Sequence, residues 1–162
     1  MTGNVGPRPR TMSTRRSFAI VASEYNPELV QALVTSAAAK INELSTGATV
    51  VLYQVPGAFE IPVIVQELAR NRTYHAIIAL GVIIFGETEH GPMIARTVTD
   101  SLQRLSLEHR IPVIHEVITA PNAAIAKERC MGVQYDRGAE AARAAVEMAQ
   151  LMTDVGRRET PR

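Results

Sequence analysis

Apolar and polar residues follow two patterns along this chain: short apolar runs, and longer stretches in which apolar residues recur at helical spacing. Four apolar runs, at residues 18–22, 48–55, 76–85 and 111–118, have the length and the Val and Ile content of strands. The third run contains no polar residue, which is typical of a strand buried on both faces at the centre of a parallel sheet. We therefore expect a sheet built around residues 76–85.

Between the runs, apolar residues recur every three or four positions, as on the buried side of a helix. Asn26 and Pro27 favour the start of the first helix, and Pro92 lies near the expected start of the third. Asn122 is expected to cap a short helix that ends near Met131. The buried positions expected in the four longer helices are Val30, Val34, Ala37, Ile41 and Leu44; Ile61, Val65, Leu68 and Ala69; Ile94, Val98, Leu102 and Leu105; and Ala142, Ala145, Ala149 and Met152.

Strands and helices alternate in the order β-α-β-α-β-α-β-α-α, without an internal repeat or a long linker. Such alternation with short connections predicts a single three-layer α/β domain. A four-stranded parallel sheet would carry helices on both faces, in a flavodoxin-like winding. We assign residues 17–153 to this domain. Residues 1–16, with two prolines and four arginines, are expected to form a flexible arm, and residues 154–162 a fraying tail.

The composition is that of a globular protein, and it argues against nucleic acid and membranes as binding partners. Of the 162 residues, 46% are hydrophobic and 20% are charged, and the net charge is +1, so nothing favours binding to nucleic acid or to a membrane. No apolar run is long enough to span a membrane, and the single cysteine, Cys130, excludes an internal disulfide. A reduced cysteine fits a cytoplasmic protein, which is the location that we expect.

Polar turns follow the predicted strands. The carboxyl ends of parallel strands meet at one edge of the sheet, where open α/β sheets bind ligands. The segments concerned are residues 24–26, 57–60, 86–90 and 115–122. The helix after residue 90 brings free backbone N–H groups to this edge, and these suit an anion. Because the histidines are scattered, no metal site is expected, and neither a nucleotide-binding glycine loop nor a nucleophilic serine motif is present. These features favour a small, phosphorylated ligand.

His90 and Glu60 are the first candidates for chemistry at this edge. His90 follows the central strand and its side chain titrates near neutrality, so it could act as a general acid or base. A surface histidine at the start of a helix would have the same sequence. Glu60 could accept hydrogen bonds from a polyol, or it could only be an acid in the first turn of a helix.

Two arginines could bind a phosphate. Arg129 lies in the short helix that is expected to point back toward the edge, and Arg137 opens the last helix with Glu140 three residues on. A guanidinium oriented by a carboxylate suits phosphate binding, whereas the same pair could also be a surface salt bridge. His75 and His109 lie in polar connections, where we expect them to be solvated.

Two sequence blocks are highly specific in this order and spacing, VPGAFEIP at residues 55–62 and GETEH at residues 86–90. Together with SEYN at 23–26, ALGVI at 79–83, ER at 128–129, RG at 137–138, EAA at 140–142 and EMA at 147–149, they resemble the 6,7-dimethyl-8-ribityllumazine synthase family. The resemblance runs from about residue 18 to residue 152 without a large gap.

The resemblance implies a transferase of riboflavin biosynthesis that uses no cofactor and no metal. Members of the family condense 5-amino-6-ribitylaminouracil with 3,4-dihydroxy-2-butanone 4-phosphate. The products are 6,7-dimethyl-8-ribityllumazine, phosphate and water, in the penultimate step of riboflavin synthesis. The family is built on pentamers with each site at a subunit interface. Some members stay pentamers, and others pair as decamers or close into sixty-subunit shells. Riboflavin synthase is a candidate partner.

The resemblance also implies roles for individual residues. His90 would be the catalytic residue, shuttling protons during imine formation and phosphate elimination. The residues implied to bind the pyrimidine and its ribityl chain are Tyr25, Asn26, Gly57, Ala58, Phe59, Glu60, Val82, Ile83 and Ile84. Those implied to bind the phosphate or to lie near the ligand are Glu87, Thr88, Arg129 and Arg137, with Glu140 holding Arg129. His115 falls where a frequent Phe reaches into the site of a neighbouring subunit.

The chain departs from the family's usual pattern at three places, and two of the departures, at residues 85 and 115, touch the rim of the implied pocket. Phe85 stands where Arg is typical, Gly-Pro-Met at residues 91–93 replaces a common Phe-Asp-Tyr, and His115 replaces Phe. These departures keep open an alternative, a non-catalytic or diverged oligomeric shell that binds a flavin or lumazine. A flavodoxin-like FMN module would need a phosphate loop after the first strand, and the segment SEYNP at residues 23–27 does not supply one.

Overall fold

The computed structural model describes residues 15–158. Over these residues, four strands form one parallel sheet in the order β2-β1-β3-β4. The strands are β1 (Ser17–Ser23), β2 (Thr49–Val55), β3 (Ala76–Ile84) and β4 (Val113–Ala120). The predictions for residues 1–14 and 159–162 fall outside the described residues.

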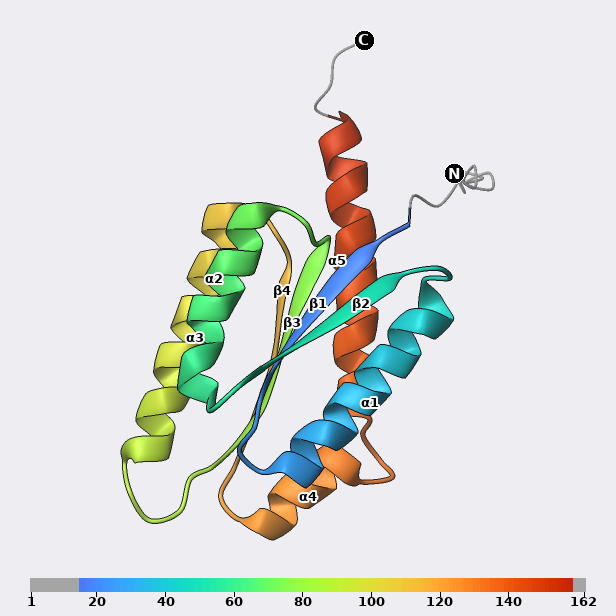
Figure 1. Cartoon of the computed structure of the whole chain (residues 1–162). Coiled ribbons are helices and arrows are strands. Elements are labelled where there is room, and N and C mark those ends of the chain that lie inside the picture. Colours follow the sequence, from blue (N-terminus) through green and yellow to red (C-terminus); the bar gives the residue numbers. More distant parts are fainter. Residues whose placement is uncertain (1–14, 159–162) are drawn as a thin grey trace, which may run out of the picture.

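Helices cover both faces of this sheet. They are α1 (Pro27–Leu44), the short 3-10 helix η1 (Ala58–Glu60), α2 (Ile61–Asn71), α3 (His90–His109), α4 (Ala123–Met131) and α5 (Arg137–Arg158). Figure 1 shows α2 and α3 on one face of the sheet and α1, α4 and α5 on the other. The predicted three-layer α/β arrangement is therefore confirmed. Within residues 15–158, no helix has the length and apolar character needed to cross a membrane.

The central strand is β3, as its unbroken apolar sequence predicts. Its first seven residues are all buried, and it pairs with β1 on one side and β4 on the other. Alternate side chains enter opposite layers, so that Ile78 and Leu80 pack toward α1 and α5, whereas Ile77 and Ala79 pack toward α2 and α3. This double burial holds the carboxyl end of β3 in place, and the candidate site lies beyond that end.

Several predicted boundaries and buried positions differ from the structure. Strand β4 starts and ends two residues later than predicted, because Pro112 has no N–H to donate to a ladder. Leu44, predicted to be buried, is exposed in the last turn of α1. Leu33, which was not predicted, is buried in the same helix. Met152 is also exposed, and α5 continues to Arg158, so residues 154–158 do not fray as predicted. The side chains of Gln150 and Asp154, one turn apart, share a hydrogen bond that supports this last part of the helix.

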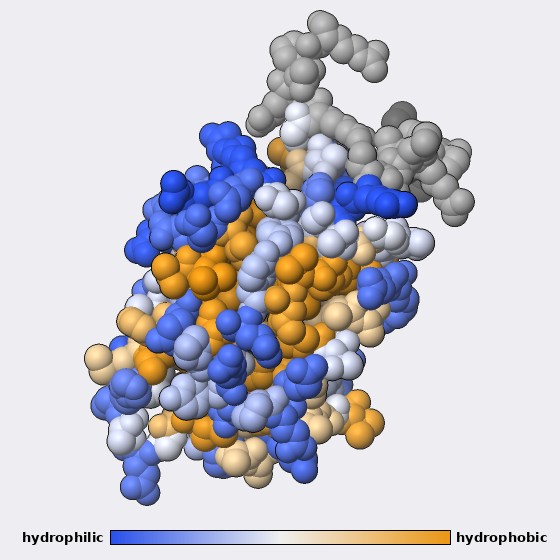
Figure 2. All heavy atoms as spheres, in the orientation of Figure 1, coloured by the Kyte–Doolittle hydropathy of each residue, from blue (hydrophilic) through white to orange (hydrophobic). Residues whose placement is uncertain are grey.

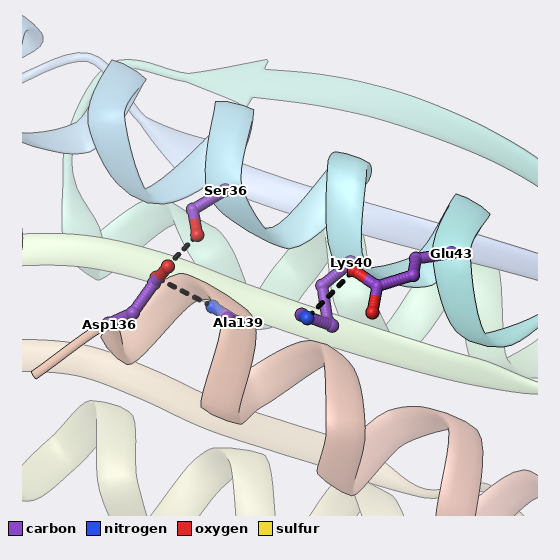
Figure 3. Close-up of polar contacts among 5 residues, drawn as sticks. All are labelled: Ser36, Lys40, Glu43, Asp136 and Ala139. Carbon is purple, nitrogen blue, oxygen red and sulfur yellow. Dashed lines mark hydrogen bonds and ion pairs between the residues drawn. The ribbon is translucent and has the colours of Figure 1, made fainter.

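Helices α1 and α5 pack closely side by side, and Asp136 joins them. Its carboxylate accepts a hydrogen bond from the backbone N–H of Ala139, which caps the start of α5, and another from the hydroxyl of Ser36 on α1 (Figure 3). Gly138 lies against the carbonyl oxygen of Leu33, where any side chain would collide with backbone. The predicted start of the last helix at Arg137 is thus confirmed and is set by contacts with α1.

Hydrophobic side chains also gather on the surface. Figure 2 shows them across the middle of the face that is turned to the viewer, in the region where the edge strand β2 runs in Figure 1. Leu52 of β2 is exposed, and so are Phe59 and Val63 at the start of α2. Contiguous exposed apolar surface is a common mark of an interaction site.

Candidate active site

Three of the four predicted polar segments meet in one cleft at the carboxyl edge of the sheet. The cleft has a volume of about 730 Å³ and lies where β1, β2 and β3 end. Its lining residues are Tyr25, Asn26, Gly57, Ala58, Phe59, Glu60, Val82, Ile83, Ile84, Phe85, Thr88, His90, Gly91, Met93, Ile94 and Thr97. A cleft of this size, with polar groups on a largely apolar lining, is what a small-molecule site requires.

Tyr25 and Glu60 meet over Gly57 at one end of the cleft. A Cβ atom at position 57 would lie 3.3 Å from the ring carbons of Tyr25 and 2.9 Å from a carboxylate oxygen of Glu60. Only glycine therefore allows the ring and the carboxylate to approach the backbone this closely. The Tyr25 ring is 71% exposed and can stack with a flat ligand ring. Glu60 stands at the N-cap position of α2 but makes no capping hydrogen bond with its side chain, which leaves the carboxylate open to a ligand.

Asn26 has a different role from the predicted one. Its backbone is left-handed, with φ of 56°, and its side chain does not cap α1. The carboxamide instead donates a hydrogen bond to the carbonyl oxygen of Val82, at 3.0 Å. Asparagine tolerates this backbone conformation better than most residues, so it can turn away from the helix. Asn26 thereby ties the turn that carries Tyr25 to the end of the central strand.

The last residues of β3 have an open backbone edge toward β1. The pairing of β1 with β3 ends at Ala22 and Leu80, whereas the pairing of β3 with β4 continues to Ile84 and Ala120. On the β1 side residues 82–84 therefore have no strand partner, although the Val82 carbonyl is already bonded to Asn26, and these residues lie where the cleft forms. Unpaired backbone donors and acceptors in extended conformation suit the edge of a flat heterocycle.

A short loop runs from Gly86 to the start of α3 and brings two side chains to the cleft. Gly86 has a φ of 59°, which allows the chain to turn sharply after β3. Thr88 and His90 line the cleft, and His90 is the first residue of α3, two residues before the predicted start. No side chain caps this helix, Pro92 has no N–H and the N–H of Met93 is bonded to Glu89, so the donors left for an anion are the backbone N–H groups of His90 and Gly91. Glu87 is exposed on the loop and does not line the cleft.

The other predicted site residues lie elsewhere in the single chain. His115, Arg129, Arg137 and Glu140 do not line the cleft. Arg129 donates a hydrogen bond to the carbonyl oxygen of Thr119, at the end of β4. Glu140 pairs with Arg137 at 3.4 Å, because both lie on one side of the first turn of α5. The ion pair that Glu140 makes in the described chain is thus with Arg137, and its implied support of Arg129 stays a prediction.

His115 is held by two hydrogen bonds against α3. Its Nδ1 atom accepts from the backbone N–H of Val117 at 3.1 Å, so the proton of the neutral ring lies on Nε2, which is 2.7 Å from the Thr99 hydroxyl. Burial among these neighbours lowers the pKa of His115, which keeps the ring neutral. His115 nevertheless remains exposed to solvent on the edge strand β4.

The model of the 6,7-dimethyl-8-ribityllumazine synthase family matches residues 15–153. The chain belongs to this family. It is 43% identical over 135 residues to the 6,7-dimethyl-8-ribityllumazine synthase of Aquifex aeolicus, covering 83% of this chain and 88% of that protein. The synthase of Coxiella burnetii (strain Dugway 5J108-111) is 35% identical over 145 residues, 88% of this chain and 96% of that one. The synthase of Verminephrobacter eiseniae is 36% identical over 148 residues, which cover 91% of this chain and 94% of that protein.

Two departures from the usual lumazine synthase pattern are joined in space. Gly91 is buried beneath Phe85, and a Cβ atom at position 91 would lie 2.9 Å from a ring carbon of Phe85 and 3.1 Å from its Cα. Phe85 also donates its backbone N–H to the carbonyl oxygen of Ala120, at 2.9 Å. The aromatic ring at position 85 thus fits only because residue 91 is a glycine. The two residues pack together at the base of the loop at residues 86–90.

Some residues that line the cleft of this lumazine synthase family member were not predicted as site residues. Met93, Ile94 and Thr97 lie on the side of α3 that faces the cleft. Ile94 was predicted as a core position. Thr97 lies four residues after Met93 and three after Ile94, on the same side of the helix, and this spacing could have added Thr97 to the predicted site.

His109 was predicted to be solvated, but its Nε2 atom is buried and has no hydrogen-bond partner among the described residues. Within residues 15–158, no cluster of His, Cys, Asp and Glu side chains could hold a metal ion.

Proposed function

We propose that the cleft condenses 5-amino-6-ribitylaminouracil with 3,4-dihydroxy-2-butanone 4-phosphate to 6,7-dimethyl-8-ribityllumazine, releasing phosphate and water. One observation carries the proposal. In a chain of this family, an aromatic platform, a free carboxylate, an open strand edge and a histidine at a helix N-terminus line the same 730 Å³ cleft. No step of this reaction requires a cofactor or a metal. Much of the rate would come from holding the two substrates together in the orientation for reaction.

The pyrimidine substrate suits the end of the cleft that Tyr25 forms. Its ring would stack on the exposed Tyr25 side chain, and its polar edge would bind the open backbone of residues 82–84. The ribityl hydroxyls would then reach the backbone of residues 57–59 and the carboxylate of Glu60, which caps no helix and is free to accept. The long polyol and the flat ring thus fit different parts of one cleft.

The phosphorylated substrate suits the N-terminus of α3. The uncapped N–H groups of the first turn and the hydroxyl of Thr88 would bind the phosphate, and His90 on the same turn would carry protons during imine formation and phosphate elimination. Glu87 would contribute its backbone N–H from the loop.

The cleft of one chain lacks a cation for this phosphate. Among the described residues that line it, none is Lys or Arg, although a phosphate dianion in a largely apolar cleft calls for one. We propose that Arg129 of an adjacent subunit supplies the charge, with Arg137 and His115 of that subunit near the rim. Arg137 would remain paired with Glu140, which fixes the direction of its guanidinium.

Assembly on pentamers would bring the two half-sites together. A groove of about 260 Å³ between α2 and α3, with a mixed polar and apolar lining, shares Phe59 and Thr97 with the cleft, so a subunit seated in the groove would reach the cleft. Phe59 and Val63 are 59% and 62% exposed in the single chain, which favours such a contact.

The domain would be residues 17–153, with the terminal segments outside it. We also propose the cytoplasm as its location and riboflavin synthase as the consumer of the product.

The first experiment is a steady-state assay of lumazine formation from the two substrates, followed by the absorbance of the product. We expect formation well above the uncatalysed rate measured without protein. If the pyrimidine or riboflavin binds but no product forms, the alternative of a non-catalytic flavin-binding or lumazine-binding shell replaces the synthase. The three relatives compared above all bear the synthase name, so they give no support to that alternative.

A further inference from the structure

A second pocket lies at the opposite edge of the sheet, where the strands begin. It has a volume of about 250 Å³ and is bounded by the ends of α2 and α3, the starts of β3 and β4, and the last part of α5. In Figure 1 these helix ends lie at the same end of the molecule as the start of β1, away from the loop that carries His90. None of the residues that line this pocket lines the cleft, so it is not part of the proposed active site.

The side chains around this pocket are strongly biased toward positive charge. Arg72, His75, His109 and Arg110 line it, and no described lining residue is acidic. They come from three places, the end of α2, the start of β3 and the end of α3. Helix α5 contributes Ala149, Met152 and Thr153 to the lining. A chain with a net charge of only +1 thus places two guanidinium groups and two imidazoles around one small hollow.

Both arginines occupy backbone conformations that do not favour them. Arg72 ends α2 with φ of 51°, and Arg110 ends α3 with φ of 53°, where glycine or asparagine is usual. A cation at a helix C-terminus is favourable, but this gain is similar in size to the cost of a left-handed backbone for a residue with a side chain. The stability of the two helix ends therefore does not account for arginine at both positions. A ligand held by both guanidinium groups would account for it.

The two histidines differ in what they offer a ligand. The Nε2 atom of His109 is buried and has no hydrogen-bond partner among the described residues, and because it is closed to solvent it offers no hydrogen bond to a ligand in the open pocket. His75 accepts the backbone N–H of Ser17 on its Nδ1 atom at 3.0 Å, so its neutral ring carries a proton on Nε2 that can be donated. The His75 ring thus retains a hydrogen-bond donor beside the two arginines.

We propose that this pocket binds a small phosphoryl anion. Guanidinium and imidazole donors that come from three elements suit a tetrahedral group with several oxygens better than a single planar carboxylate. The volume admits a phosphate or pyrophosphate, and it is below the range of pockets that hold drug-sized ligands. The site goes beyond the proposed function, because it uses no residue of the cleft.

Titration calorimetry with inorganic pyrophosphate at low ionic strength tests the proposal on the full chain. The key variant is R72G/R110G, because glycine suits both left-handed positions and removes both guanidinium groups without harm to the fold. The matched control is R70A/R143A, which removes two exposed helical arginines that line neither the pocket nor the cleft. A third protein, R129A, removes the cation proposed for the active site.

We expect R129A to retain one equivalent of pyrophosphate per chain, and R72G/R110G to bind that equivalent about tenfold or more weakly. The control should bind as the wild type does, and R72G/R110G should keep its unfolding midpoint and its lumazine synthase activity. The same affinity in R72G/R110G and in the control would overturn the proposal. So would loss of all binding in R129A, which would assign the anion to the active site alone. An inactive wild type that still binds pyrophosphate through Arg72 and Arg110 would contradict the proposed function and leave this site standing.

Discussion

The ring of Phe85 covers the backbone of Gly91, so closely that a Cβ atom at position 91 would lie 2.9 Å from the ring. These two residues flank the loop at residues 86–90, which carries Thr88 and His90 into the cleft. The contact therefore fixes both ends of the loop. It also explains how the chain accommodates an aromatic residue at position 85, since the space for the ring comes from the side chain that is absent at position 91.

We predict that Gly91→Ala disturbs the loop, because the added carbon also meets the Cα of Phe85 at 3.1 Å and backbone cannot move aside as a side chain can. The free energy of unfolding should fall by about 1–3 kcal/mol, as for other overpacked sites, and kcat should fall with it. Urea unfolding and steady-state kinetics on the same preparations measure both effects.

The double variant F85A/G91A is the control for this contact. Removing the ring relieves the 2.9 Å contact and leaves the 3.1 Å contact with the Cα of residue 85, so the two substitutions should couple in part and the double variant should be more stable than the sum of the single effects predicts. If the effects simply add, the contact does not hold the loop.

Arg129→Ala should raise the KM for the phosphorylated butanone far more than the KM for the pyrimidine. The reason is that the cleft of one chain offers no cation of its own among its described lining residues, so the proposed arginine of the adjacent subunit would carry the charge of the phosphate. Steady-state kinetics with each substrate varied in turn separates the two constants. Lys127→Ala, two residues away on the same helix and also exposed, is the matched control and should leave both unchanged. Equal increases in the two KM values would argue against a phosphate role.

Much of the fold could be predicted from the sequence, because unbroken apolar runs and helical stripes directly reflect burial on the two faces of a parallel sheet. The central position of β3 followed from its lack of polar residues, and the cap of α4 by Asn122 is present as predicted. Asn26 shows the limit of this reasoning. Its residue type favours a helix cap, but its carboxamide bonds to Val82, which is 56 residues further along the chain, and local sequence preference contains no such information.

The site was predictable in part for the same reason. Residues that follow strands β1, β2 and β3 meet because parallel strands share an edge, so Tyr25, Glu60 and His90 could be placed together. The resemblance implies that Glu140 holds Arg129, but it does not give the ion pair seen in the structure. The spacing of three residues on one helix indicates that pair, which is Arg137 with Glu140. The pocket between Arg72 and Arg110 was also not apparent, since nothing in their spacing shows that α2 and α3 end beside each other.

His90→Ala should lower kcat by about tenfold or more if proton transfer limits the rate. The side chain is exposed at the start of α3 and makes no contact that the helix requires, so the unfolding midpoint should stay the same. Single-turnover measurements at saturating substrate report the chemical step directly. An unchanged rate would mean that positioning of the two substrates accounts for the catalysis.

Glu116→Gln should stabilise the protein at neutral pH and lose this advantage in acid. Burial on β4 raises the pKa of the Glu116 carboxyl above its ordinary value of 4.5, with Arg137 opposing the rise and Glu140 adding to it. Between pH 4.5 and the raised value, the folded protein holds a proton that the unfolded chain has lost. The stability of the wild type therefore falls as the pH rises through this window and stays lower above it. Glutamine cannot ionise, so the fall should be absent from the variant.

Urea unfolding at one protein concentration, repeated from pH 4 to pH 8, gives the two stability curves. The curves should meet at the acid end and separate above pH 4.5, with the glutamine variant the more stable. Glu147→Gln on the exposed side of α5 is the control and should follow the wild type. If Glu116→Gln is instead less stable at neutral pH, the attraction of Arg137 outweighs the cost of burying the carboxylate, and Glu116 is then a partner that orients Arg137 together with Glu140.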